Sequence, residues 1–326
     1  MIVALLAVSS VLCAGLPMLA ALAALWWLDR YEREPVWLLL LVFAWGAVGA
    51  VSLAMFGSFV VMMPVSMLFG ATIANHTGTV LIAPLVEEPT KALILPLVAR
   101  SRHFDGAVDG FVYGGATGLG FAMTENFLYF VESAVEGDVA AWIGTVAIRT
   151  FFAAMMHATA SSLVGACVGW GLYRGRPATA LGGLLGLLLA MTVHGIWNGL
   201  LTAEQVLGAN GVLFGTGLLV LPAEILVAFL VFQACLWEEG RTIRRELQEE
   251  VALGTLPAQH VPILASTWRR QRRGWLRVGV HRSSYVRDAT TLAFRRLQAR
   301  SLHGPRYEAC MAQILQIRAQ LRQANA

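Results

Sequence analysis

Ionisable side chains stand inside several long apolar stretches of the sequence, where their chemistry needs an explanation. An ionisable group inside a membrane span costs about 2.5–3.5 kcal/mol on insertion scales, so such residues are candidates for function. The ionisable residues are Glu87, Glu88, Lys91, Glu125, Arg149, His157, His194 and Glu224, and the amides Asn126 and Asn198 accompany them. A single residue of this kind could serve only to form a hydrogen bond between helices. The whole set together indicates a functional site. We leave Glu224 out of that site.

The helical spacing of these residues limits which of them can act together. Glu87 and Lys91 are four residues apart, as are His194 and Asn198, so each pair shares one helix face. Glu88 points about 100° away from Glu87, so the two carboxylates cannot face the same way. One of them can face a cavity while the other pairs elsewhere, with Lys91 or Arg149. The spacing leaves open which glutamate is the reactive one.

A carboxylate beside an imidazole can polarise a water molecule for attack on a carbonyl carbon. Nearby His and Asn side chains can donate hydrogen bonds to the oxyanion that forms. The sequence has neither a G-x-S-x-G nucleophile elbow nor an H-E-x-x-H zinc motif. Hydrolysis by an activated water, without a cofactor, is therefore the simplest hypothesis.

Two alternatives use the same residues differently. Zinc could be bound by Glu88 (or Glu87), His157 and His194, with an open position for water. The chain could also be a non-enzymatic membrane protein, either an immunity factor or a proton-coupled carrier, because carboxylate–histidine chains also move protons. We see no internal repeat of the kind common in carriers, which disfavours that alternative.

The elements that must position these residues are membrane helices. Hydrophobic residues make up 57% of the 326 residues and charged residues only 13%, which predicts an all-α polytopic membrane protein. We expect residues 1–28 to be a first span rather than a cleaved signal peptide. Residues 59–78, which include Pro64, are expected to form a loop, with a re-entrant loop as the alternative. The seven predicted spans are 4–28, 36–58, 79–99, 108–130, 146–172, 179–200 and 212–236.

The loop charges predict the orientation of the spans. Arginines cluster in residues 29–34, 100–103 and 173–176, whereas the loop over 131–140 carries only acids. The positive-inside rule then places the N-terminus outside and the C-terminus in the cytoplasm.

We divide the chain into a transmembrane helical domain (1–237), which carries the candidate hydrolytic site, and a helical cytoplasmic tail (238–326) of unknown role. The tail has 16 arginines and 7 acids, a net charge of +9. It is expected to be a solvated appendage near the bilayer, with anionic lipid or a cytoplasmic protein as its partner in preference to nucleic acid.

The predicted spans place the polar residues at a similar depth. At about 1.5 Å per residue, Glu87 and His194 lie roughly 12 Å and 10 Å below the outer ends of their spans. If Arg149 marks the outer edge of the fifth span, His157 lies roughly 12 Å below that edge. Four helices would thus contribute to one site in the outer half of the membrane.

Four motifs in this order resemble those of the PrsW family of intramembrane proteases. They are EEPTKAL (87–93), DGFVYGGATGLGFAMTEN (109–126), MMHATASS (155–162) and HGIWN (194–198), and the resemblance extends over roughly residues 29–235. The wider group, which includes CAAX-type prenyl proteases and bacteriocin-processing enzymes, has the motif EExxxR. Here Ala92 stands at the position of that arginine and Lys91 precedes it, as suits the PrsW branch.

The resemblance implies a role for each residue. Glu87 would be the general base, with His157 holding the water, and His194 and Asn198 would form the oxyanion site. Supporting residues would be Glu88, Lys91, Glu125 and Asn126. The resemblance also implies a multi-pass protein of the bacterial inner membrane that cleaves a single-span membrane protein, such as an anti-sigma factor.

Overall fold

The computed structural model describes residues 2–29, 31, 33–101, 103–136 and 138–325, and every regular element in these ranges is a helix. The predicted all-α class is therefore confirmed. The chain forms two compact units, each described separately below. The first comprises Met1–Leu28 and Glu34–Val231, and the second comprises Asp29–Arg33 and Phe232–Ala326.

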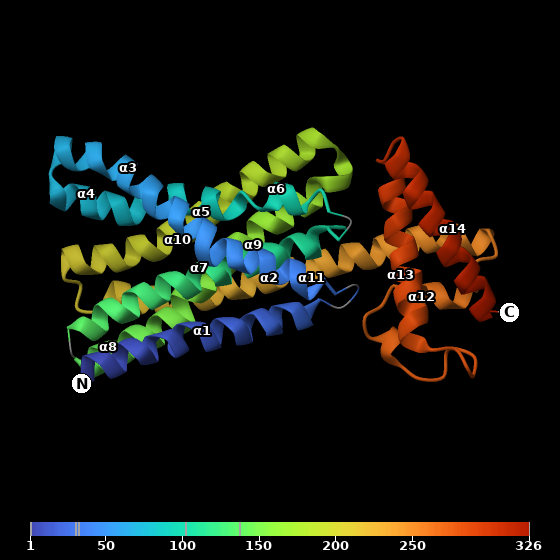
Figure 1. The fold of residues 1–326 in the computed structure, drawn as a ribbon, viewed down its shortest axis with the longest axis horizontal. Helices are drawn as coiled ribbons and strands as arrows, with labels where there is room; N and C mark the ends of the chain where they lie inside the picture. Colours follow the sequence, from blue (N-terminus) through green and yellow to red (C-terminus); the bar gives the residue numbers. More distant parts are fainter. Residues whose placement is uncertain (1, 30, 32, 102, 137, 326) are drawn as a thin grey trace. The chain divides into compact units, whose positions relative to one another are not determined.

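The first unit is a bundle of long helices, several of which contain π-helical turns (Figure 1). Its elements are α1 (Ile2–Leu28), α2 (Val36–Ala44), η1 (Trp45–Ala50), α3 (Val51–Phe69), α4 (Ala71–Thr77), η2 (Gly78–Ile82), α5 (Ala83–Ala92), α6 (Leu95–Val98), α7 (Ala107–Val135), α8 (Val139–Ile148), η3 (Arg149–Ala153), α9 (Ala154–Gly171), η4 (Leu172–Arg174), α10 (Arg176–Leu207) and the start of α11 (Val212–Ala252).

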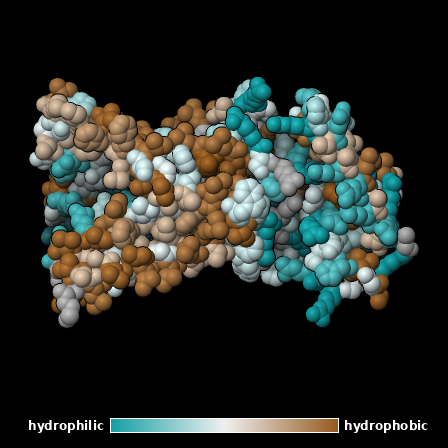
Figure 2. Space-filling model, in the orientation of Figure 1, coloured by the Kyte–Doolittle hydropathy of each residue, from teal (hydrophilic) through white to brown (hydrophobic). Residues whose placement is uncertain are grey.

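Five helices among the described residues are long and apolar enough to cross a membrane: Ile2–Leu28, Val36–Phe69, Val139–Arg174, Arg176–Leu207 and Val212–Ala252. Figure 2 shows mostly hydrophobic residues on the visible face of the first unit, as a lipid-facing bundle requires. The chain is therefore a multi-pass membrane protein. The count of seven spans and the side of each terminus stay predictions.

Helix α7 is the buried centre of this unit. Every residue from Val108 to Ala122 is buried. Three glycines, Gly110, Gly114 and Gly118, repeat every fourth residue on the face toward α9. Small residues at this spacing let two membrane helices approach closely.

The glycines of α7 set the position of a candidate site residue. A Cβ atom added at Gly118 would lie 2.3 Å from the carbonyl oxygen of His157, and one at Gly114 would lie 2.1 Å from that of Ser161. No side chain fits at these distances. The glycine stripe therefore holds α9, with His157, directly against α7.

The loop predicted over residues 59–78 is wrong. Helix α3 continues through Pro64 to Phe69, and the chain reverses at Gly70, whose φ of 83° suits glycine. Helix α4 then runs back beside α3 (Figure 1). The apolar residues 59–69 continue the helix, and one proline did not suffice to end it.

The helix that contains the predicted fifth span begins before residue 146, so Arg149 is not at a helix end. Helix α8 begins at Val139, where the Asp138 side chain accepts hydrogen bonds from the backbone N–H groups of Ala140 (2.9 Å) and Ala141 (3.3 Å). Arg149 instead opens the π-helical turn that leads into α9.

Helix α5, which carries the two adjacent glutamates, is a short helix between two irregularities. A π-helical turn precedes Pro84, and the helix ends at Ala92, three residues after Pro89. Prolines such as Pro84 and Pro89 cannot donate a backbone hydrogen bond, which explains irregular helix on both sides of this segment.

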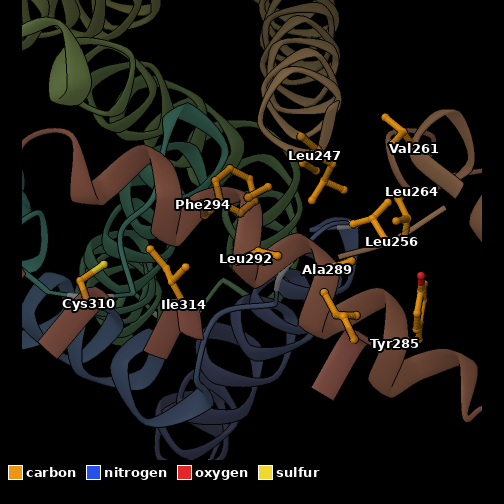
Figure 3. Close-up of a cluster of buried hydrophobic side chains, with 13 residues drawn as sticks. Leu247, Leu256, Val261, Leu264, Tyr285, Ala289, Leu292, Phe294, Cys310 and Ile314 are labelled. Atoms are coloured by element: carbon orange, nitrogen blue, oxygen red, sulfur yellow. The ribbon is translucent and has the colours of Figure 1, made fainter. Parts of the chain in front are cut away.

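The second unit has its own hydrophobic core, part of which is shown in Figure 3. The C-terminal part of α11 contributes Leu247 to it, and Leu292 and Ile314 come from two later helices. Besides that part of α11, its elements are η5 (Ala258–His260), α12 (Val261–Leu264), η6 (Arg269–Gln271), α13 (Arg282–Ala299) and α14 (Pro305–Asn325).

Candidate active site

Four side chains predicted to act together converge inside the first unit. Glu87 and Glu88 come from α5, His157 from α9 and His194 from α10. One nitrogen or oxygen atom of each lies within 4.8 Å of those of the other three. Only 0–2% of Glu88, His157 and His194 is exposed. Glu87 is the more open of the two glutamates, with 13% of its side chain exposed.

Lys91 lies among these groups. Its Nζ atom is 2.8 Å from Glu88 Oε1, 3.3 Å from Glu87 Oε2 and 2.9 Å from His157 Nδ1. The side chain is 1% exposed, and the ammonium group lies 3.9 Å from the centroid of the Phe121 ring. One buried cation therefore binds both carboxylates, as burial of two negative charges requires.

His157 is held at both ring nitrogens. A lysine ammonium only donates, so Nδ1 accepts from Lys91, and Nε2 must donate to Glu125 Oε2 at 2.6 Å. The same Glu125 oxygen pairs with Arg149 Nη2 at 3.0 Å. These contacts fix both the tautomer and the orientation of the imidazole.

His194 is held at one ring nitrogen and leaves the other facing Glu87. Its Nδ1 donates to Glu88 Oε1 at 2.8 Å, so the neutral ring carries a lone pair on Nε2. That Nε2 atom lies 4.0 Å from Glu87 Oε2. The distance is too long for a direct hydrogen bond and suits a water molecule bound by both groups.

The other predicted residues lie around this cluster or outside it. Asn126 is fully buried, and its Oδ1 accepts from Arg149 Nε at 3.0 Å. Asn198 donates through Nδ2 to the carbonyl oxygen of Thr79 at 2.9 Å. Glu224 makes no contact with the cluster among the described residues, and its Oε2 is buried without a partner.

The sequence interpretation missed one member of the site. Phe121 contacts the Lys91 ammonium and lies 5.3 Å, between ring centroids, from His157. Arg149 was among the expected polar residues, as a partner for Glu87 or Glu88, yet it pairs with Glu125 and lies over the Tyr129 ring at 3.6 Å.

The charges of the cluster are not balanced within it. Three carboxylates face two permanent cations, Lys91 and Arg149, and Glu88 Oε2 is buried without a hydrogen-bond partner. An unpaired buried oxygen is costly and marks a site of function more often than a stabilising contact. The cluster can accept a proton from a reacting water, or bind a further cation through its carboxylates and imidazoles.

Comparisons with known proteins identify the family of this chain. The family model described as "PrsW family intramembrane metalloprotease" matches residues 34–233. Protease PrsW of Bacillus subtilis is 30% identical over 206 residues, which cover 60% of this chain and 84% of that protein. Protease PrsW of Clostridioides difficile is 35% identical over 123 residues, covering 36% and 50%, respectively. Protease PrsW of Geobacillus kaustophilus is 28% identical over 203 residues, covering 60% and 81%.

No solved structure matches the chain. The matched region contains all of the clustered side chains, from Glu87 to His194. The chain is thus a membrane protease by homology, and it belongs to the PrsW family of intramembrane proteases.

Proposed function

We propose that this protein is an endopeptidase that hydrolyses a peptide bond of a membrane-anchored protein with a water molecule held between Glu87 and His194. The observation that carries the proposal is the 4.0 Å gap between Glu87 Oε2 and His194 Nε2. A water molecule in that gap can hydrogen-bond to both atoms at once.

In the first step, Glu87 removes a proton from this water as its oxygen bonds to the carbonyl carbon of the substrate. The tetrahedral intermediate collapses when the C–N bond breaks, and the proton on Glu87 passes to the leaving nitrogen. Glu87 fits this role better than Glu88 because its side chain is partly exposed, whereas Glu88 is fully buried.

The contacts favour His194 over His157 as the partner of the water. Both nitrogens of His157 are already engaged, with Lys91 and Glu125, whereas Nε2 of His194 faces Glu87. His157 and Glu125 then act by holding Lys91. Glu88 orients the His194 ring through Nδ1, as a carboxylate does in catalytic triads.

Asn198 is the proposed donor to the oxyanion. Its amide uses one N–H group for Thr79 and has a second N–H group to offer. An oriented amide N–H of this kind contributes about 10²–10³-fold in acyl-transfer enzymes. Asn126 supports the site through Arg149.

Zinc is the second candidate for activating the water, because the family description names a metalloprotease and because the donor set fits by type and by closeness. Glu88, His157 and His194 would hold it, and bound zinc would supply a Lewis acid. Lys91 disagrees with this assignment, since its ammonium already lies within 2.9 Å of both Glu88 and His157. We therefore favour the mechanism that needs no cofactor.

The proposed substrate is a single-span membrane protein, such as an anti-sigma factor, in the bacterial inner membrane. The site is surrounded by apolar helices, which suits a substrate held in the lipid bilayer. We place the site toward the extracytoplasmic side, with the C-terminal tail in the cytoplasm, as the loop charges predict.

The test is cleavage of a panel of single-span substrates by the purified full chain and by Glu87→Gln, which keeps the size of the side chain but removes the base. We expect a loss of about 10²–10⁴-fold. Glu132→Gln on α7 is the matched control, because this exposed acid lies outside the cluster. Normal cleavage by Glu87→Gln would overturn the assignment.

The same panel tests the two histidines. His194→Ala is expected to lose cleavage to a similar extent as Glu87→Gln, and His157→Ala to lose it through displacement of Lys91. His76→Ala, an exposed histidine on α4, is the matched control. Full activity of His194→Ala would contradict the proposed water site.

A further inference from the structure

The second unit carries a loop, residues 266–282, that we call the cationic loop. No aspartate or glutamate occurs between residues 251 and 287, and the loop contains six arginines. The arginines are Arg269, Arg270, Arg272, Arg273, Arg277 and Arg282. The positive charge is therefore concentrated in one segment, and no acid nearby in the sequence neutralises it.

Three of these arginines have no acid to pair with. Arg269, Arg272 and Arg273 are exposed and form no ion pair with any described residue. In the same unit, Arg296 and Arg318 pair closely with Glu250. The unit therefore neutralises Arg296 and Arg318 and leaves Arg269, Arg272 and Arg273 available to an outside anion.

The cationic loop also forms a cavity of about 270 Å³. Its lining includes Arg272, Arg273, Arg277 and Arg282. Trp275 is also among the lining residues. Guanidinium groups around a cavity of this size suit a phosphate group, which arginine binds in a bidentate manner.

The loop is anchored to the body of the second unit. The Trp275 ring lies edge-on to His260 at 5.2 Å and to Tyr285 at 5.9 Å, and the guanidinium of Arg270 lies over the Tyr31 ring at 4.5 Å. Arg282 donates to the backbone carbonyl of Gln271 at 2.5 Å. The exposed arginines are thus presented from a supported loop.

Two large apolar residues flank the arginines in solvent. Trp268 is 83% exposed and Val278 is fully exposed. Exposed tryptophan beside arginine is typical of segments at a membrane surface, where the ring enters the headgroup region and the cations meet lipid phosphates.

We propose that the cationic loop binds anionic phospholipids, with the lipid phosphate in the arginine-lined cavity and with Trp268 and Val278 in the headgroup region. The same chain enters the membrane through α11, so the loop is tethered to the bilayer. Each arginine near an anionic surface strengthens association by on the order of fivefold. This lipid site is independent of the proposed proteolysis.

The experiment uses the full chain in nanodiscs of phosphatidylcholine alone or of phosphatidylcholine mixed with phosphatidylglycerol, under limited trypsin digestion followed by mass spectrometry. Cleavage after Arg269 and Arg277 is expected to slow at least about fivefold in the anionic discs. Cleavage after Arg306 and Arg322, on α14, is the internal control and is expected to be equal in both discs.

Two double variants sharpen the test. Arg272→Gln with Arg273→Gln should abolish the protection of Arg277 in anionic discs. Arg306→Gln with Arg322→Gln removes the same charge from α14 and should leave that protection intact.

Equal cleavage of the wild-type loop in both kinds of disc would overturn the proposal. Protection in neutral discs by added inorganic phosphate or by an RNA oligonucleotide, without protection by phosphatidylglycerol, would overturn it in favour of a soluble ligand.

Discussion

Each unit contains a buried network of acids and bases among its described residues, and the two networks differ in how their polar atoms are satisfied. In the second unit, both oxygens of Glu250 are bonded: Arg318 Nη2 lies 2.6 Å from Oε1, and the Thr255 hydroxyl lies 2.8 Å from Oε2. In the first unit, Glu88 has one oxygen without a partner, and Glu87 faces His194 across a gap. The second network is fully paired, whereas the first leaves atoms free to react.

The cations also suit the second network to stable pairing and the first to proton exchange. The second unit uses Arg296, Arg300 and Arg318, which stay charged and bind carboxylates through a rigid fork. The first unit uses a lysine and two histidines next to its glutamates. Histidine is the side chain best suited to exchange protons near neutral pH. The comparison predicts that changes in the first network affect catalysis and that changes in the second affect stability.

The largest effect should follow from Lys91→Met, which removes the cation between the two carboxylates. Glu87, Glu88 and His157 lose their common partner, and a misplacement of about 1 Å in an active site can cost 10²-fold in rate. We expect cleavage to fall by about that factor or more in a steady-state assay. Lys91→Arg restores the charge in a different shape, and partial recovery of the rate should distinguish loss of charge from loss of fit.

Arg318→Met should instead lower stability. Glu250 is fully buried, and breaking a buried ion pair by removing one partner costs about 3–5 kcal/mol. Arg318 is 17% exposed and Arg296 remains near Glu250, so we expect the loss in the free energy of unfolding to lie at the low end of this range. Hydrogen exchange of the α14 amides would measure it. Cleavage should stay within about twofold of the wild-type rate; a loss comparable to that of Lys91→Met would erase the distinction between the networks.

Much of the first network was predictable from the sequence, because ionisable residues are rare in apolar helices. The four motif segments gave the residues of the cluster, and the spacing correctly gave the contact between Glu87 and Lys91. Tertiary packing decided the rest. The partner of Arg149 is Glu125, 24 residues away, and a charge pattern along one helix does not reveal a contact between helices.

The fold was predictable to a similar extent. Hydropathy correctly predicted an all-helical membrane protein, and the loop over residues 59–78 was wrong because Pro64 does not interrupt α3, while Gly70 ends it. Hydropathy also says nothing of the close approach of α7 and α9. That approach depends on which face of α7 its glycines occupy, and on what α9 presents to them.

Gly118→Ala tests that packing. The added methyl group would lie 2.3 Å from the carbonyl oxygen of His157, so α9 must move and displace the imidazole from Lys91. We expect cleavage to fall by roughly tenfold, less than for Lys91→Met because the charges remain. Gly144→Ala on α8 is the matched control, since nothing lies within 4 Å of the added atom. Equal rates for the two variants would show that the site tolerates the displacement.

The smallest effect concerns His260 in the second unit. Burial lowers the pKa of His260, whose Nδ1 lies 2.8 Å from the Tyr285 hydroxyl. The unfolded chain then binds a proton more readily than the folded unit, so the stability present above the ordinary histidine pKa of about 6.5 falls as the pH is lowered. One titrating group can change the free energy of unfolding by at most about 1.4 kcal/mol per pH unit. The protection of α13 amides, which is the exchange rate relative to the intrinsic rate at the same pH, should fall from pH 7 to pH 5.5 in the wild type and fall less in His260→Gln.

The claim that Glu87 activates the water without a metal is tested most directly by one measurement: the cleavage rate of the wild-type chain after zinc has been removed by a chelator and its residual zinc content determined. We predict a rate within about twofold of that before treatment, with zinc far below one ion per chain, because Lys91 supplies the cation that binds Glu88 and His157. A rate that disappears with the zinc and returns when zinc is added back would contradict this account.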